Sequence, residues 1–140
     1  MAIVSVPREA AALTQLERAI ALYMERDYIP AITLAGAAES LLGGLLKYKG
    51  RDHALDGDVS AAIAFELHLT GEDLSRPRVI SDLNYARDQL KHFGDGADIV
   101  FDLAVAAYDM IERAIGNYWR LSGTITNTME HFFRQSCPDV

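Results

Sequence analysis

The sequence predicts an all-α protein, an up-and-down helical bundle of four main helices with additional short helices. The chain contains about twenty alanines, and alanine has the highest helix propensity of all residues. Along most of the chain, apolar residues recur three and four positions apart, as they do on one face of a helix. No stretch alternates apolar and polar positions with many β-branched residues, as a half-buried strand would. With 140 residues, half of them hydrophobic, the chain has the size of one globular domain, residues 1–140.

The first two helices are predicted at about residues 7–27 and 30–48. Pro7 suits a first helical turn, where its missing N–H is not needed. Pro30 has the same place in the second helix, and Gly50 follows the end of that helix. The apolar face of the first helix is formed by Leu13, Leu16, Ile20 and Met24.

The middle of the chain is predicted to contain a polar loop over residues 49–58, a short third helix at about 59–69 and a connection over 71–78. A fourth helix follows at about 79–93, and Gly94 ends it. The apolar positions of this fourth helix are Val79, Leu83, Ala86, Leu90 and Phe93.

The last part of the chain is predicted to form a long fifth helix at about 97–121 and a short terminal helix at about 126–134. Asp95 and Asp98 are suitable N-caps for the fifth helix, and Gly123 separates it from the last one. Its apolar face is formed by Leu103, Ala106, Met110, Ile115 and Trp119.

Composition and charge exclude several classes of protein. A net charge of −7 argues against a non-specific binder of nucleic acid or of anionic membranes. The single Cys137 cannot form an intrachain disulfide, and the N-terminal residues lack the regions of a signal peptide. The apolar stretch 29–46 carries Glu39 and is rich in Gly and Ala, which favours a buried core helix over a membrane span. We therefore expect a cytoplasmic protein that does not bind a membrane.

No cofactor or metal motif is found in the sequence. The histidines form no His-x-x-x-His or Glu-x-x-His pair, so no metal site is expected. There is no Gly-x-Gly-x-x-Gly, no Walker-type phosphate loop and no Gly-x-Ser-x-Gly turn, so no bound cofactor is expected either. The histidines are His53, His68, His92 and His131.

Glu39 lies in a helix that has only three polar residues between positions 31 and 46. Such a helix is expected to be buried nearly all round. A buried carboxylate needs a partner or a proton to offset its lost hydration, and an Arg or His from another helix is the expected partner. Gly36, Ser40 and Gly44 form a stripe of small residues that lets another helix approach, although tight core packing alone also explains the stripe.

One face of the fourth helix is predicted to be polar. On a helical projection five polar side chains fall within an arc of about 140°, and the apolar residues occupy the opposite side. Asp88 and His92 are four residues apart, so the carboxylate can hold one imidazole nitrogen and leave the other free. The five residues of this face are Asn84, Arg87, Asp88, Lys91 and His92.

The polar face has the groups that cleavage of a phosphodiester requires. A base must remove the proton of the 2′-hydroxyl, and a cation must stabilise the charge that grows on phosphorus; these roles fit His92 and Arg87. The two lie about 140° apart on a continuous helix, so they can flank a cleft without touching. Tyr85, beside this face, is a candidate for stacking on a base. A solvated helix face with an ordinary ion pair is the alternative interpretation.

The segment Asn84-Tyr-Ala-Arg-Asp-Gln-Leu-Lys-His92 resembles the Arg-x4-6-His signature of the HEPN superfamily, whose members are helical-bundle proteins. The upstream segment Leu34-Ala-Gly-Ala-Ala-Glu39 resembles the small-residue helix with a glutamate found in a bacterial HEPN-like group. Asp88 occupies a position at which Asn is common in the family. Its added negative charge would weaken the approach of an RNA phosphate unless His92 or Lys91 holds it.

The resemblance implies a metal-independent endoribonuclease that leaves 2′,3′-cyclic phosphate ends. In that family the site is composite, with Arg87 and His92 contributed across the two-fold axis of a homodimer. The resemblance further implies a toxin or phage-defence component that an antitoxin or another partner protein neutralises. The residues expected to support the two catalytic ones are Glu39, Asn84, Asp88 and Lys91.

Two other functions stay open at the level of the sequence. In the first, Glu39, Arg87 and His92 form a buried polar network that fixes helix register in a non-catalytic binding or scaffold module. In the second, the same pocket binds a small molecule or a nucleotide. Trp119, near the end of the fifth helix, is expected in the core or in a dimer interface.

Overall fold

A computed structural model describes residues 1–136 and confirms the all-α helical bundle, with no strand in that range. The sequence-based expectation for Cys137 falls outside the described residues. The helices are α1 (Arg8–Met24), α2 (Tyr28–Tyr48), α3 (Ala54–Thr70), α4 (Arg76–Leu83), α5 (Tyr85–Lys91), α6 (Leu103–Ser122) and α7 (Asn127–Ser136).

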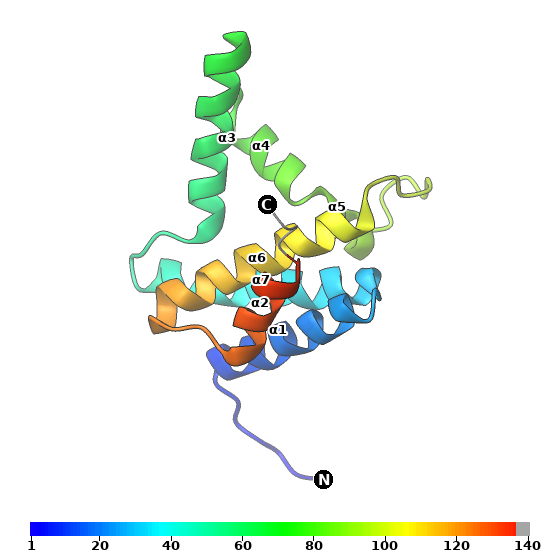
Figure 1. Cartoon of the computed structure of the whole chain (residues 1–140), viewed down its shortest axis with the longest axis vertical. Helices are drawn as coiled ribbons and strands as arrows, with labels where there is room; N and C mark the ends of the chain where they lie inside the picture. The colour runs from blue at the N-terminus through cyan, green and yellow to red at the C-terminus, as the bar shows by residue number, and fades with distance from the viewer. Residues whose placement is uncertain (137–140) are drawn as a thin grey trace.

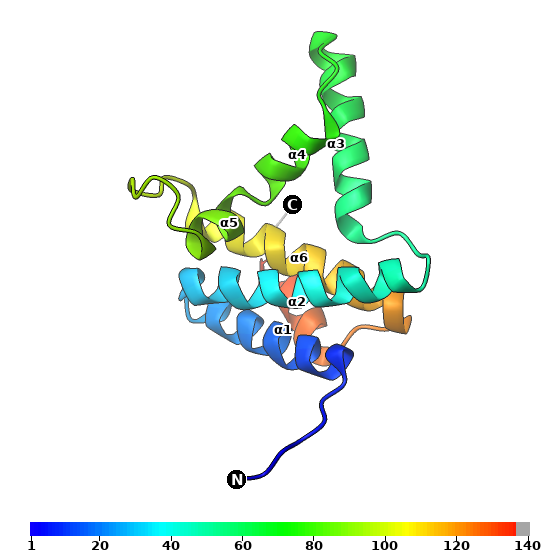
Figure 2. The same ribbon diagram turned by 180° about the vertical axis from the view of Figure 1, so that it is seen from behind.

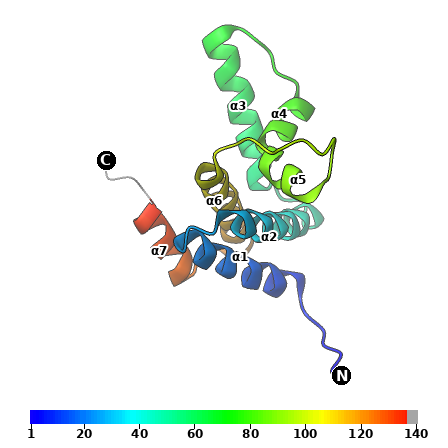
Figure 3. The same ribbon diagram turned by 90° about the vertical axis from the view of Figure 1, so that its right-hand side faces the viewer.

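The body of the bundle consists of α1, α2 and α6, with α7 packed against α1 (Figures 1 and 3). A short turn makes α1 and α2 antiparallel neighbours (Figure 1). In contrast, α2 and α6 run in the same direction: Glu39 pairs with Arg113, and four residues further along both helices Gly43 lies beside Asn117. The chain between them, residues 49–102, therefore makes an excursion away from the body and returns.

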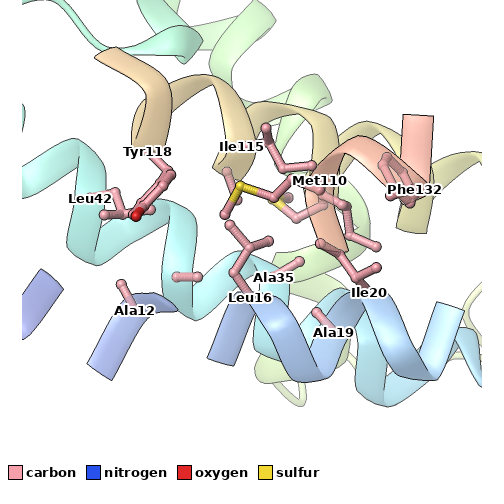
Figure 4. Packing of buried hydrophobic residues seen from close by; sticks show 14 residues of the cluster. Ala12, Leu16, Ala19, Ile20, Ala35, Leu42, Met110, Ile115, Tyr118 and Phe132 are labelled. Carbon is pink, nitrogen blue, oxygen red and sulfur yellow. The ribbon is translucent and has the colours of Figure 1, made fainter. Parts of the chain in front are cut away.

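The core lies between α1, α2, α6 and α7 (Figure 4). Alanines at several contact positions let the helices approach closely, and larger aliphatic side chains fill the remaining space. Full burial of one Leu or Ile side chain contributes about 1.5 to 3 kcal/mol. The buried cluster comprises Ala12, Leu16, Ala19, Ile20, Ala35, Ala38, Leu42, Met110, Ile111, Ala114, Ile115, Tyr118, Met129 and Phe132.

Within residues 1–136, α2 is the one helix long and apolar enough to cross a membrane by length and composition. Half of its apolar window is buried inside the protein, between α1 and α6. This is the packing expected of the core helix of a soluble protein.

The third helix is longer than predicted and extends away from the body (Figures 1 and 2). The prediction of a loop up to residue 58 is wrong, because α3 already begins at Ala54. The side-chain Oδ1 of the buried Asn117 accepts a hydrogen bond from the Ala54 backbone N–H at 2.7 Å, which satisfies a free donor of the first turn. Asp56 adds favourable negative charge at this N-terminus.

The fourth helix is not continuous, which corrects the prediction of one helix over residues 79–93. It is divided at Asn84 into α4 and α5, and α5 ends at Lys91. Arg113 of α6 causes the break: its guanidinium donates to the Leu83 carbonyl at 3.1 Å and to Asn84 Oδ1 at 2.7 Å. The contact with Leu83 satisfies a carbonyl that a continuous helix would pair with the N–H four residues further on.

The boundary of α6 also differs from the prediction. The helix begins at Leu103 rather than at about residue 97, and Asp102 is its N-cap, with a side chain that accepts from the Val105 N–H at 3.0 Å. Asp95, one of the predicted caps, instead accepts a hydrogen bond from the Ala97 N–H at 3.0 Å within the preceding loop.

Candidate functional site

Glu39 is buried in the middle of α2, and two arginines neutralise it. Its Oε2 lies 3.2 Å from Nη1 of Arg87, and its Oε1 lies 3.3 Å from Nη2 of Arg113. The prediction that an arginine from another helix pairs with this carboxylate is confirmed for Arg87. Arg113 is a second partner that sequence reasoning missed.

The Arg87 side chain is held at several points and is 21% exposed. Nη1 donates to Glu39 and to Ser40 Oγ at 3.3 Å, and Nε donates to Asp88 Oδ1 at 3.2 Å. Nη2 makes no hydrogen bond to any described residue. The guanidinium is therefore fixed in place with one edge free to donate.

Gly36 makes room for this arginine. A Cβ at position 36 would lie 2.7 Å from Cδ and 2.8 Å from Cγ of Arg87. Ser40, the next member of the small-residue stripe, contacts the same guanidinium, whereas a Cβ at Gly44 would meet nothing within 4 Å. The first part of the stripe thus admits the Arg87 side chain where α5 packs on α2.

Arg113 and Asn117 complete the buried polar cluster from α6. Arg113 bridges Glu39 and the α4–α5 junction at Asn84, and Asn117 Nδ2 donates to the Glu39 carbonyl at 3.2 Å. Both residues lie on the buried face of α6, three and seven positions after Met110. Polar residues on the apolar face of an amphipathic helix were the signal that could have revealed them.

The polar face predicted from Asn84 to His92 is divided in the structure. Asn84 is buried at the helix junction, and Arg87 and Asp88 pair with each other. Lys91 and His92 are exposed and have no polar side-chain partner among residues 1–136.

The predicted side-chain pair between Asp88 and His92 is not formed among the described residues, because α5 ends before His92. His92 is the C-cap of α5: its backbone N–H still donates to the Asp88 carbonyl at 2.9 Å, but its own φ of −112° and ψ of 140° are extended rather than helical. Asp88 is instead neutralised by Arg87. That contact offsets the negative charge that would otherwise weaken the approach of a phosphate.

A cleft of about 830 Å³ lies next to this cluster, with walls from α3, α4, α5 and α6. We call it the α6 cleft. Tyr85 lines it, partly exposed, with its ring edge-on to Phe101 at 6.3 Å between centroids. Trp119 lines the same cleft and is 57% exposed, so it does not belong to the core of a single chain.

Three carboxyls in the wall of the α6 cleft have a pKa above its ordinary value. Partial burial is the largest cause at Asp58, Asp109 and Glu112. The positive charge of Arg113 opposes the rise in pKa at Asp58 and Asp109, while the neighbouring carboxylates add to the rise at Glu112. The cleft thus combines exposed aromatic rings with a cluster of carboxylates.

Within residues 1–136 no group of three or more His, Cys, Asp or Glu side chains is placed to hold a metal ion. The arrangement contains a fixed arginine with a free donor edge, and an exposed imidazole and an exposed ammonium at the end of the same short helix. Comparison of the chain with family models, curated proteins and solved structures gave no match.

Proposed function

We propose that the protein is a HEPN-like endoribonuclease that cleaves RNA without a metal ion. Its site is composite and is built across the two-fold axis of a homodimer from Arg87 and His92 of each protomer. The observation that carries the proposal is the anchoring of Arg87: Glu39 and Asp88 hold Nη1 and Nε, while Nη2 stays free five residues before an exposed histidine.

The anchored guanidinium suits the stabilisation of charge that develops during the reaction. A donor that is already fixed needs no reorganisation when the phosphorane forms, and this is the main source of such electrostatic catalysis. The formal charges of Glu39, Arg87, Asp88 and Arg113 cancel, so attraction of the phosphate rests on the free Nη2 donor and on exposed Lys91.

The imidazole of His92 supplies the base in this mechanism. It takes the proton from the ribose 2′-hydroxyl, the 2′-oxygen bonds to phosphorus, and the bond from phosphorus to the 5′-oxygen breaks. The leaving 5′-oxygen takes a proton from solvent, so the products are a 2′,3′-cyclic phosphate and a 5′-hydroxyl. His92 and Arg87 do not contact each other within one chain, which is why the proposed site needs a second copy.

The test is cleavage of end-labelled tRNA and mRNA by the purified protein in EDTA. We expect cleavage that survives EDTA, yields cyclic-phosphate ends and disappears in the Arg87→Ala and His92→Ala proteins. His131→Ala, which removes another exposed histidine, is the matched control and should cleave like the parent. Cleavage that is unchanged in both site variants would rule the mechanism out.

Two further parts of the proposal concern the cell. We place the enzyme in the cytoplasm, where RNA is its substrate, as a toxin or phage-defence component. An active ribonuclease there needs a neutralising partner protein, so co-expression with that partner should restore the growth of cells that the enzyme inhibits. Growth inhibition by the His92→Ala protein equal to that of the parent would contradict this role.

A second candidate function is a non-catalytic helical module, and the burial of Glu39 with two arginines favours it. In that case the ion pairs fix the register of α2, α5 and α6 and contribute nothing to chemistry. A folded dimer that cleaves neither tRNA nor mRNA would favour this function over the enzyme.

A further inference from the structure

The outer part of α3, residues 60–70, is mostly exposed, although α3 packs against α4. We call it the arm. In α3 only Ala54 and Val59, near its base, are buried. The arm nevertheless carries large apolar side chains: Phe65 is 63% exposed, Leu67 49% and Leu69 60%. Helices of this length gain most of their stability from burial of an apolar face, so the arm lacks the packing that would hold it.

The whole chain exposes more surface than a compact monomer of its size. Its accessible surface is 9029 Å², whereas a folded monomer of 15.4 kDa exposes about 7200 Å². The extended residues 1–7 contribute part of the excess of roughly 1800 Å². A standard interface buries about 800 Å² on each partner, so the excess is large enough for a stable dimer interface.

The α6 cleft also has exposed apolar side chains, which could pack against those of the arm. Two of its aliphatic residues, Leu83 and Val105, are exposed, as are the rings of Tyr85 and Trp119. The base of α3 lines the cleft through Ala54 and Asp58, and the arm of the same chain extends away from α6 (Figures 1 and 2). A single chain therefore presents both an apolar helix and an apolar cleft, and neither is covered.

We propose that α3 is an exchange arm, with Phe65 and Leu69, which lie on one face of the helix, packed into the α6 cleft of a second copy. A two-fold axis pairs each arm with the opposite cleft, so both unpaired surfaces are buried at once and the assembly closes. The occupant of the cleft is thus a second copy of this chain, which carries the complementary surface.

The arrangement supplies an interface for the two-copy site of the proposed function. It rests on exposed apolar surface, however, and not on RNA cleavage. Tyr85, on the helix that carries Arg87, lines the α6 cleft, so a partner's arm would lie close to that helix.

Mass in solution is the first test, by sedimentation or light scattering at micromolar concentration. The parent should have twice the mass of one chain. Phe65→Asp on the arm and Trp119→Ala in the cleft should each weaken the dimer at least about tenfold, as loss of a central interface residue does. Tyr48→Asp, at a 90% exposed aromatic outside both surfaces, is the matched control and should leave the mass unchanged. Circular dichroism shows whether each variant keeps its helices.

Cross-linking tests the pairing of the two surfaces directly. A Phe65→Cys chain is mixed with a Trp119→Cys chain that carries a larger tag, both with Cys137→Ser. Oxidation should give a mixed dimer of intermediate size, and Tyr48→Cys in place of Trp119→Cys should give none.

A monomeric parent, or a dimer that neither variant weakens and that yields no mixed cross-link, would overturn the exchange arm. Its failure is distinguishable from failure of the enzyme. If the Phe65→Asp protein is still dimeric and still cleaves RNA, the exchange arm is wrong and the ribonuclease proposal stands. If the dimer depends on the arm but the protein does not cleave RNA, the ribonuclease proposal is wrong and the exchange arm stands.

Discussion

At the scale of single residues, the site depends on how one buried carboxylate is shared. Glu39 accepts from Arg87 at one oxygen and from Arg113 at the other. Arg113 is almost completely buried and also holds the junction at Asn84, whereas Arg87 is partly exposed and keeps a free donor. The two arginines therefore differ in their surroundings: Arg113 joins buried groups of the fold, and Arg87 keeps the donor that the proposed function assigns to the RNA phosphate.

Removal of Arg113 should cost more stability than removal of Arg87. The Arg113→Ala change leaves Glu39 Oε1 and Asn84 Oδ1 without donors, and breaking a buried ion pair costs about 3 to 5 kcal/mol. After Arg87→Ala, Glu39 keeps its contact with Arg113. We therefore expect the free energy of unfolding to fall by about 1.5 to 3 kcal/mol, the range for loss of a hydrogen bond to a charged group. Urea unfolding of each variant measures both free energies.

The control for this comparison is Arg134→Ala, which removes an exposed arginine of α7. It should change the free energy of unfolding by no more than about 0.5 kcal/mol. An Arg87→Ala protein as unstable as the Arg113→Ala protein would contradict the division of roles and favour the non-catalytic module.

Gly36→Ala should separate activity from folding. The added Cβ would lie 2.7 Å from Arg87 Cδ, so the arginine must move away from Glu39. Ala stabilises a helix by up to about 1 kcal/mol relative to Gly, so the fold should survive. We expect RNA cleavage to fall nearly as far as in Arg87→Ala. Gly44→Ala, where the added Cβ meets nothing, is the matched control and should keep full activity. Equal activity in the two variants would show that the position of Arg87 does not matter.

At the scale of elements, the sequence predicted a helix correctly where all the residues that determine the helix lie within the segment itself. The first two helices, at about 7–27 and 30–48, agree with α1 and α2 because proline, glycine and apolar spacing all lie within the segment. The break at Asn84 was not predictable in this way, since it depends on Arg113, which lies 29 residues further along the chain.

The same distinction applies to the candidate site. The burial of Glu39 predicted an arginine partner, because an isolated carboxylate in an apolar helix has few alternatives. The predicted pair of Asp88 and His92 assumed a continuous helix, and that assumption failed where α5 ends. Arg113 lies on the apolar face of α6, three positions after Met110, and the prediction did not use this signal.

The wall of the α6 cleft should make stability depend on pH. The pKa of Asp109 and of Glu112 is raised from 3.8 and 4.5 chiefly by burial, so the folded state binds their protons more tightly than the unfolded state. The stability from these groups is fully present below the unfolded pKa and is lost as pH rises through the folded pKa. At pH 7 both carboxylates therefore destabilise the fold.

Asp109→Asn and Glu112→Gln should accordingly raise the melting temperature at pH 7. The gain over the parent should shrink as pH falls towards 4, where the parent carboxyls take up protons. Glu9→Gln, on the exposed first turn of α1, is the control and should show no such gain. A melting temperature at pH 7 that falls in both cleft variants would mean that favourable contacts of the ionised carboxylates outweigh the cost of their burial.

At the scale of the whole molecule, the closed body of α1, α2, α6 and α7 contrasts with the open region formed by α3 and α4 (Figure 1). The body has a continuous core, whereas the arm and the α6 cleft leave apolar surface in water. If two copies exchange arms, folding of this region and association are one process. The stability of the protein then depends on its concentration.

The melting temperature should therefore rise with protein concentration. For a dimer that unfolds to two separate chains, a tenfold increase in concentration adds about 1.4 kcal/mol of stability. For a protein of this size that corresponds to a shift of about 2 to 4 °C. Melting curves over a hundredfold range of concentration measure the slope. Phe65→Asp should abolish the slope because its chains no longer associate, while Tyr48→Asp should keep it. A parent whose melting temperature does not change with concentration would show that a single chain is stable with its arm exposed.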